Sequence, residues 1–138
     1  QFDFNEHVSF KSVLNYTYGR YIDSKLDSVI PLDHISPMFG QTSLIYKNKS
    51  VDGEFFVRYN GKKALSDYSP SGEDNFKYAT ANGMPAWFTL NIRMGVNLTK
   101  NLRLNAACEN ITDNRYRAFA SGINAPGRNF IISLRYKM

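Results

Sequence analysis

An alternation of apolar and polar residues with a period of two runs through six segments of this chain and constrains its fold more than any other feature. Between residues 88 and 98, the apolar series Phe88, Leu90, Ile92, Met94, Val96 and Leu98 alternates with Thr89, Asn91, Arg93, Gly95 and Asn97. Successive side chains of a β-strand point to opposite faces, so this period predicts a strand with one apolar and one polar face. Helical spacing appears over no useful length, and we therefore predict an all-β fold.

Five further strands are expected at about residues 8–19, 40–47, 53–61, 102–109 and 129–138, and residues 2–4 indicate the tail of an earlier strand. Ile45 and Phe56 interrupt the alternation in two of these segments. The connections at 22–37, 62–86 and 111–127 are long and rich in turn-forming residues, whereas those at 5–7, 48–52 and 99–101 are short. Strands joined in this way form an antiparallel up-and-down meander with its long loops at one end.

Such a meander fits a soluble calyx, whose apolar face points inward, or an outer-membrane barrel, whose apolar face points to lipid. The aromatic residues favour the barrel. Strand direction puts one group near the short-turn end, Phe10, Tyr46, Phe55 and Tyr136, and a second group near the long-loop end, Tyr16, Tyr18, Tyr59, Phe88 and Phe130. The apolar positions between them are mostly aliphatic, and two aromatic girdles around an aliphatic band are typical of outer-membrane barrels.

The opposite face carries polar and charged side chains, among them Lys11, Asn15, Arg58, Asn60, Asn91, Arg93, Arg103, Asn105, Glu109 and Arg135. Unpaired charges are costly in an apolar ligand pocket, so this face suits a water-filled lumen or one filled by a polar plug. The sequence therefore predicts a transmembrane β-barrel wall, with a soluble small-ligand-binding barrel as the alternative.

Length and composition exclude several other classes. The 138 residues form one domain at most, and no window approaches the ~20 apolar residues of a membrane-spanning helix. The net charge of +5 comes from 17 Lys and Arg against 12 Asp and Glu, without a basic run, so nucleic-acid binding is not expected. The chain starts at Gln1 rather than Met, and we interpret it as a piece of a longer protein.

The chain offers little for enzymatic chemistry. His7 falls in a short turn and His34 in a long loop, at opposite ends of the meander, so they cannot share a metal ion. No serine stands in a recognisable nucleophile context, and the single cysteine, Cys108, lies in a strand as a small apolar residue. We therefore predict no catalytic residues, no metal site and no cofactor.

Four longer strings resemble the C-terminal barrel region of TonB-dependent outer-membrane receptors. They are residues 31–40 (PLDHISPMFG), 83–91 (GMPAWFTLN), 109–117 (ENITDNRYR) and 121–130 (SGINAPGRNF), and the last two are the most specific. Within them, we expect the residues from Asn110 to Asp113 to hydrogen-bond their own backbone, and Pro126 with Gly127 to turn the chain into the last strand. Met138 departs from the family, whose last residue is usually aromatic.

The resemblance implies that residues 1–138 supply the C-terminal six or so strands of a barrel of about 22 strands, closed around an N-terminal plug that this chain lacks. It implies a Gram-negative outer-membrane receptor that takes up a scarce nutrient, a siderophore, vitamin, haem or glycan, with energy from TonB. The implied partners are the remaining strands and plug, the TonB complex, outer-membrane lipid and a surface lipoprotein. The alternative is a structural barrel subunit of a larger surface complex.

Candidate binding residues lie mainly in the long connection 62–86. It carries Asp67, Tyr68, Glu73, Asp74 and Tyr78, with Trp87 directly after it, and Arg117 follows in the next long connection. Acidic and aromatic groups can stack on a flat or sugar-like nutrient while hydrogen-bonding its edges, and Arg117 can contact an anionic group. On the lumen side, we expect Arg58, Arg93 and Arg103 to pair with carboxylates of the plug.

Overall fold

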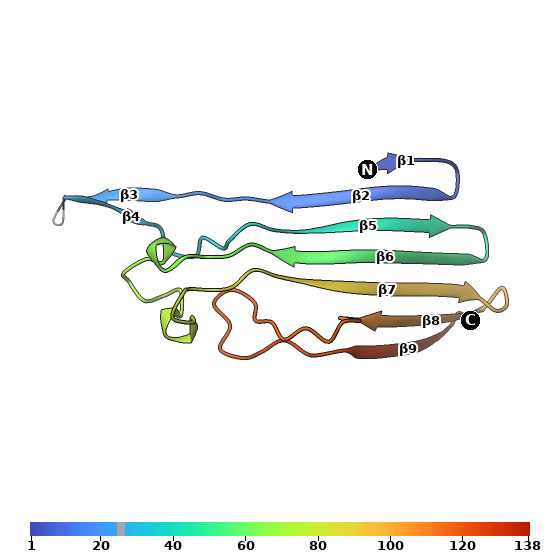
Figure 1. Cartoon of the computed structure of the whole chain (residues 1–138). Helices are drawn as coiled ribbons and strands as arrows, with labels where there is room; N and C mark the ends of the chain where they lie inside the picture. Colours follow the sequence, from blue (N-terminus) through green and yellow to red (C-terminus); the bar gives the residue numbers. More distant parts are fainter. Residues whose placement is uncertain (25–26) are drawn as a thin grey trace.

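The computed structural model describes residues 1–24 and 27–138, and one antiparallel sheet dominates it (Figure 1). The strands of this sheet pair in the order β1 (Phe2–Asp3), β2 (Val8–Asn15), β5 (Phe39–Lys47), β6 (Val51–Asn60), β7 (Trp87–Asn97), β8 (Leu102–Glu109) and β9 (Asn129–Tyr136). Within this sheet each strand therefore lies beside the next one along the chain, and only β3 and β4, between β2 and β5, belong to a separate sheet. The all-β fold and the up-and-down order predicted from the alternation are confirmed.

Local hydrogen bonds explain why the chain reverses so tightly between some strands. Asn5 Oδ1 accepts hydrogen bonds from the backbone N–H groups of His7 (2.8 Å) and Val8 (2.9 Å). In the turn between β7 and β8, Thr99 Oγ1 accepts from the N–H of Leu102 at 3.0 Å. These side-chain acceptors replace the ladder partners that the turn residues lack. The short turns lie at one end of the sheet, and the long connections, with the 3₁₀ helices η1 (Leu65–Asp67) and η2 (Phe76–Tyr78), lie at the other (Figure 1).

The first long connection differs from the sequence prediction. We expected a loop over residues 22–37, but β3 (Arg20–Asp23) pairs with β4 (Ser28–Pro31) in a separate two-stranded antiparallel sheet. Neither segment alternates, because two apolar residues are adjacent in each, Tyr21 with Ile22 and Val29 with Ile30, so a period of two does not indicate these strands. The strand expected over 8–19 likewise ends earlier, at Asn15. Lys25 and Leu26 of the expected loop lie outside the described residues.

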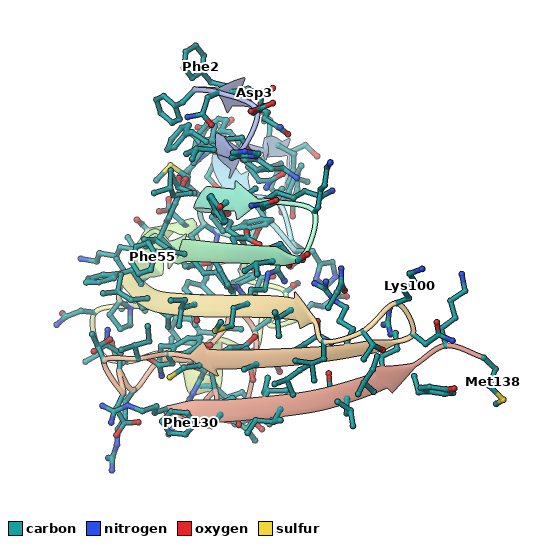
Figure 2. The ribbon with its side chains drawn as sticks, turned by 90° about the vertical axis from the view of Figure 1, so that its right-hand side faces the viewer. Phe2, Asp3, Phe55, Lys100, Phe130 and Met138 are labelled. Atoms are coloured by element: carbon teal, nitrogen blue, oxygen red, sulfur yellow. The ribbon has the colours of Figure 1, made fainter. Side chains whose placement is uncertain are left out.

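The register of the sheet brings the apolar residues into rows. Successive Cα partners across the sheet are Phe2, Phe10, Leu44, Phe55, Ile92, Cys108 and Phe130. Residues paired in this way share one face, so the apolar face runs without a break from β1 to β9 (Figure 2). Its large side chains are widely exposed, with Phe2 61% and Phe130 72% accessible. The predicted assignment of the two faces is confirmed.

The depth of the aromatic residues in a membrane stays a prediction. Barrel strands tilt by about 35–45°. A row of Cα partners therefore does not lie at one depth, and the register does not test whether the aromatic residues form two girdles.

The sheet has the character of a wall rather than of a closed body. In the described residues, β1 and β9 are edge strands with one partner each, and the buried large apolar side chains are Phe56, Tyr68 and Met84. Soluble monomers rarely expose a contiguous apolar surface of this extent. The apolar face and the two edge strands are therefore surfaces that lipid or further protein would cover. The barrel of about 22 strands stays a prediction.

Candidate functional site

Two of the three arginines predicted to meet a plug are neutralised by carboxylates of the sheet itself. Arg93 Nε donates to Glu54 Oε2 at 2.7 Å, and the guanidinium lies 5.2 Å from the centroid of the Phe56 ring. Arg103 on β8 forms an ion pair with Asp52 on β6. The charges of Arg93 and Arg103 are thus balanced within the wall.

The ion pair between Arg103 and Asp52 depends on a glycine in the strand between them. Asp52, Gly95 and Asn105 are Cα partners across β6, β7 and β8. A Cβ atom at Gly95 would meet the guanidinium of Arg103, which crosses this residue on its way to β6. A side chain at position 95 would displace the flexible end of Arg103, so this geometry of the ion pair needs a glycine in β7.

Arg58, the third predicted plug contact, differs from the other two. It lies on the polar face as the Cα partner of Gln41 and Thr89, and its side chain is exposed. No carboxylate in the described part of the chain pairs with it. Arg58 is thus a positive charge without a carboxylate partner among the described residues, near the long-loop end of β6.

A buried ion pair between Lys63 and Asp74 lies in the connection between β6 and β7 and contacts the first long connection through further hydrogen bonds. The two residues are 3% and 1% exposed, and Lys63 Nζ donates to Asp74 Oδ2 at 3.2 Å. Lys63 also donates to the carbonyl oxygen of Ile35 at 2.5 Å, and Asp74 Oδ1 accepts from the N–H of His34 at 2.8 Å. Buried charges are tolerated where such partners replace water. The pair therefore fastens the connection between β6 and β7 to the segment that precedes β5.

Backbone pairing closes the base of the connection between β6 and β7. Lys63 and Met84 exchange two hydrogen bonds, of 3.0 and 2.9 Å. Gly83 has a φ of +86°, and a Cβ atom there would also meet the carbonyl oxygen of Lys63. Glycine alone fits both conditions without strain. This closure positions Lys63 for its contact with Asp74.

Aromatic rings surround the buried ammonium group. Lys63 Nζ lies 4.2 Å from the ring centroid of Phe119 and 4.9 Å from that of Tyr68, within the range of cation–π attraction. The Tyr68 ring packs edge-on against Phe76, with the centroids 5.5 Å apart. Burial raises the pKa of the Tyr68 phenol above its ordinary value, and the negative charge of Asp74 raises it further. Because Phe119 belongs to the last long connection, this packing joins that connection to the one between β6 and β7.

Two further contacts between basic and acidic side chains lie around the buried ion pair. Arg20 Nη2 is 2.9 Å from Asp67 Oδ1 in a half-buried pair, and His34 Nε2 is 2.9 Å from Glu73 Oε2 in an exposed pair that is ionic only when His34 is protonated. An exposed pair contributes about 0–1 kcal/mol. These contacts orient the long connections that follow β2, β6 and β8, here called the loop cluster, and they add little stability.

Asp33 links the same loops through hydroxyl groups. Ser71 Oγ donates a hydrogen bond to Asp33 Oδ1. Hydrogen bonds from Ser71 and Ser69 lower the pKa of the Asp33 carboxyl, because they favour its charged form. The contact is therefore strongest when Asp33 is ionised.

Asn110 organises the last long connection, as the sequence predicted. Its φ is 50°, its Oδ1 accepts from the N–H of Asn114 at 3.0 Å, and its Nδ2 donates to the carbonyl oxygens of Asn114 (2.9 Å) and Pro126 (3.3 Å). Asp113 Oδ1 accepts from the N–H of Arg128 at 2.8 Å. The backbone-bonding role expected for this string is confirmed.

Four of the predicted binding residues line one hollow of about 280 Å³, namely Tyr68, Asp74, Tyr78 and Arg117. Arg117 Nη1 donates to the carbonyl oxygen of Tyr78 at 3.0 Å, and its Nη2 to Asn124 Oδ1 at 3.1 Å. These acceptors are neutral, so Arg117 has no counter-ion within residues 1–24 and 27–138. Arg115 lines the same hollow and, in those ranges, also makes no ion pair.

The other three predicted binding residues lie elsewhere. Asp67 lines a separate hollow of about 490 Å³, and Glu73 is exposed beside His34. Trp87 begins β7 and stacks on Tyr116, with the ring centroids 4.1 Å apart. The seven residues thus do not form one site, and their role in binding stays a prediction.

Trp87 lies on the polar face. Its Cα partner is Asn60, and the next residue, Phe88, takes the apolar face. This placement argues against Trp87 as an anchor at the lipid interface.

Sequence reasoning missed Lys63, Tyr116 and Arg115. Nothing in the sequence marks Lys63 as buried, because it stands beside Lys62 in a polar loop. Arg115 could have been predicted, because residues two apart in an extended chain point to the same side and Arg117 was a predicted binding residue. Tyr116 is found only through its contact with Trp87.

Residues 1–24 and 27–138 contain no group of three or more His, Cys, Asp or Glu side chains placed to hold a metal ion. They also contain no helix that is long and apolar enough to cross a bilayer.

An antiparallel meander with one continuous apolar face is the architecture of an outer-membrane barrel wall. Among solved structures, the chain is similar to the copper transporter OprC, with a TM-score of 0.76 and 16% identity over 97% of this chain and 22% of that one. It is also similar to a single-residue variant of the ferric enterobactin receptor PfeA from Pseudomonas aeruginosa, with a TM-score of 0.64 and 19% identity over 96% of this chain and 20% of that one.

At these identities the similarity shows the fold, and it confirms the predicted resemblance to TonB-dependent outer-membrane receptors at that level. The chain spans about a fifth of the length of the two structures. Their names describe a transporter and a receptor, and the expectation that this chain has no catalytic residues stays a prediction. No family model and no curated protein matches the chain.

Proposed function

We propose that this chain forms part of the wall of a Gram-negative outer-membrane receptor that takes up a scarce nutrient with energy from TonB. The observation that carries the proposal is the continuous, exposed apolar face on a meander that shares its fold with a transporter and a receptor. A face of this kind is stable against lipid, and the opposite polar face suits a lumen. The partners would be the remaining strands, the plug, the TonB complex, outer-membrane lipid and a surface lipoprotein.

The loop cluster would contribute to the vestibule that captures the nutrient. In support, the hollow beside Tyr78 carries the unneutralised charges of Arg115 and Arg117 next to aromatic surface. Such a lining favours a ligand with a flat or ring-containing body and an anionic group. Siderophore, haem, vitamin and glycan nutrients remain the candidate classes.

Plug contact would fall mainly on Arg58. Arg93 and Arg103 already have carboxylate partners in the wall, so pairing with a plug carboxylate adds less to them. Arg58 has no carboxylate partner among the described residues. Charge reversal at Arg58 should therefore weaken retention of the plug more than Arg93→Gln does.

Spin labels on β9 of the full-length receptor in lipid bilayers test the wall. In a Cys108→Ala background, single cysteines at Ile132 and Leu134 should give labels accessible to lipid-dissolved oxygen. Labels at Ser133 and Arg135 should instead be accessible to a water-soluble nickel chelate. Equal accessibility at neighbouring positions would contradict the wall.

Uptake in whole cells tests the transport mechanism. Nutrient uptake should stop when a protonophore collapses the proton gradient, whereas binding at the cell surface should persist. Tyr78→Ala and Arg117→Ala should weaken surface binding, with Tyr18→Ala as the control outside the hollow. Uptake that continues without a proton gradient would favour the structural-subunit alternative.

A further inference from the structure

A hollow of about 490 Å³ lies where β2 and β5 separate at the long-loop end of the sheet. The two strands pair as far as Asn15 and Phe39, and the chain then runs on from β2 towards β3 (Figure 1). Residues 16–20 line one side of the hollow, residues 35–38 line the other, and residues 61–63 complete the lining. This hollow, here called the strand gap, shares no lining residue with the hollow beside Tyr78.

The backbone along the strand gap has no ladder partners. In the ranges 1–24 and 27–138, the N–H and C=O groups of Tyr16, Thr17 and Tyr18 make no backbone hydrogen bond. The next bond along the chain, from the N–H of Leu32 to the carbonyl oxygen of Gly19 at 3.1 Å, closes the gap at its far end. Unpaired backbone groups need water or a polar ligand, and hydrocarbon supplies neither. The strand gap therefore suits polar atoms better than acyl chains.

The strand gap adjoins the apolar face. Leu14 and Gly40 are Cα partners on that face, and Tyr16 and Met38, which line the gap, stand two residues beyond them. The Tyr16 and Tyr18 side chains are widely exposed, at 71% and 69%. Tyrosine combines an apolar ring with a polar hydroxyl and is enriched where membrane meets water. A ligand of the strand gap would therefore be reached from the bilayer.

Positive charge lines the strand gap. Lys62 is exposed at the gap, and no carboxylate in the described part of the chain pairs with it. Arg20 also lines the gap, where it pairs with Asp67 and lies 5.8 Å from the centroid of the Tyr18 ring. Lys63, the third basic residue of the lining, is neutralised by Asp74. The charge of Lys62 therefore favours an anionic ligand.

We propose that the strand gap binds the phosphate headgroup of an anionic membrane lipid in the leaflet at the long-loop end. The phosphate would accept charge-assisted hydrogen bonds from Lys62 and further hydrogen bonds from unpaired backbone N–H groups along the gap, while the acyl chains would lie on the apolar face. The inference rests on the proposed function, because the apolar face meets lipid only if the sheet is a barrel wall. It goes beyond general contact with lipid, since it assigns one headgroup to one place between β2 and β5.

Two photoreactive phosphatidylglycerols test the site on the full-length receptor in lipid nanodiscs. One carries a diazirine on its headgroup, and the other carries it at the end of an acyl chain. The labelled residues are mapped by mass spectrometry. We expect the headgroup probe to label residues 16–20 and 61–62. The acyl-chain probe should instead label the exposed apolar face of β9, at Ile132 and Leu134.

The two probes separate the possible failures. Acyl-chain labelling of β9 without headgroup labelling at the strand gap would overturn the lipid site and leave the wall intact. Absence of acyl-chain labelling on β9 would overturn the wall itself, and the lipid site with it. Free glycerol phosphate, which has the headgroup chemistry without the acyl chains, should not reduce headgroup labelling. If it competed fully, the ligand would be soluble and the assignment to a membrane lipid would be wrong.

Charge variants then test the role of Lys62. Headgroup labelling at residues 16–20 should fall about tenfold in Lys62→Glu, because a charge-assisted hydrogen bond is replaced by repulsion. Lys62→Arg keeps the charge and should retain most of the labelling. Lys77→Glu, the matched control on a lysine outside the strand gap, should change it little. Unchanged labelling in Lys62→Glu, or an equal loss in Lys77→Glu, would overturn a specific headgroup site.

Discussion

Replacing Lys63 by Met should open the loop cluster while leaving the sheet intact. Met has a similar length and keeps the apolar contact with the rings of Phe119 and Tyr68 but removes the ammonium group. Asp74, 1% exposed, would then retain the hydrogen bond from the N–H of His34 and the imidazole of the same residue, whose Nδ1 lies 3.9 Å from Asp74 Oδ1 and is a counter-charge only when protonated. With His34 neutral, a buried carboxylate without a counter-charge is the main consequence of the substitution.

The expected cost follows from the burial of the pair. Removing one partner of a buried ion pair costs about 3–5 kcal/mol, because the other charge stays desolvated. At about 1.4 kcal/mol per factor of ten, local opening of the connection 61–86 should become roughly a hundred to several thousand times more frequent. The exposed pair of His34 and Glu73 sets the scale for comparison, since exposed pairs contribute about 0–1 kcal/mol.

Hydrogen exchange followed by mass spectrometry on the full-length receptor measures this opening. Peptides from 61–86 should exchange faster in Lys63→Met by the factor given above, with β7 and β8 unchanged. Glu73→Gln, the control on the neighbouring residue, should change exchange less than about sixfold. Lys63→Met/Asp74→Asn removes both charges and should recover much of the protection.

Two results would refute this reasoning. If Lys63→Met exchanged no faster than Glu73→Gln, the pair would not stabilise the cluster. If the double variant were as open as Lys63→Met, the loss would come from packing and not from an unpaired carboxylate.

Two further predictions concern Asp33 and Gly95. Because the pKa of Asp33 is lowered, its contact with Ser71 should persist above the ordinary carboxyl range and disappear as the pH falls through the lowered pKa. Carboxyl carbon NMR should show that the pKa of Asp33 rises in Ser71→Ala. Gly95→Val should displace Arg103 from Asp52 and lower the thermal stability of the folded receptor, measured by heat-modifiable mobility. Asp52→Asn in the Gly95→Val background should lower the thermal stability little further, because that ion pair is already broken.

Strand positions and faces were predictable because they depend on local alternation. The segment 102–109 coincides with β8, and the row from Phe2 to Phe130 follows the apolar face read from the sequence. Short elements were not predictable in the same way. The strands β3 and β4 pair through segments in which polar and apolar residues do not alternate, so a period of two does not indicate them.

Ionic partners were beyond the sequence for a different reason. Asp52 and Arg103 are far apart in the chain, and only the order of β6, β7 and β8 brings them into reach. The same order shows that Arg93 meets Glu54, whereas no carboxylate of the described residues meets Arg58. A sequence states how many charges a face has, but the register decides which of them are left without a partner.

The all-β fold, the alternation of faces, the order of long and short connections and the resemblance to a receptor barrel could all be predicted from the amino-acid sequence. Each of these follows from residues that are neighbours in the chain, because side-chain direction in a strand and turn formation are local properties. The packing of the folded chain was needed to show that Asp74 lies buried against Lys63, whereas Arg117 has no counter-ion among the described residues. Burial and charge neutralisation depend on contacts between distant segments, and those contacts exist only once the strands have paired and the loops have packed together.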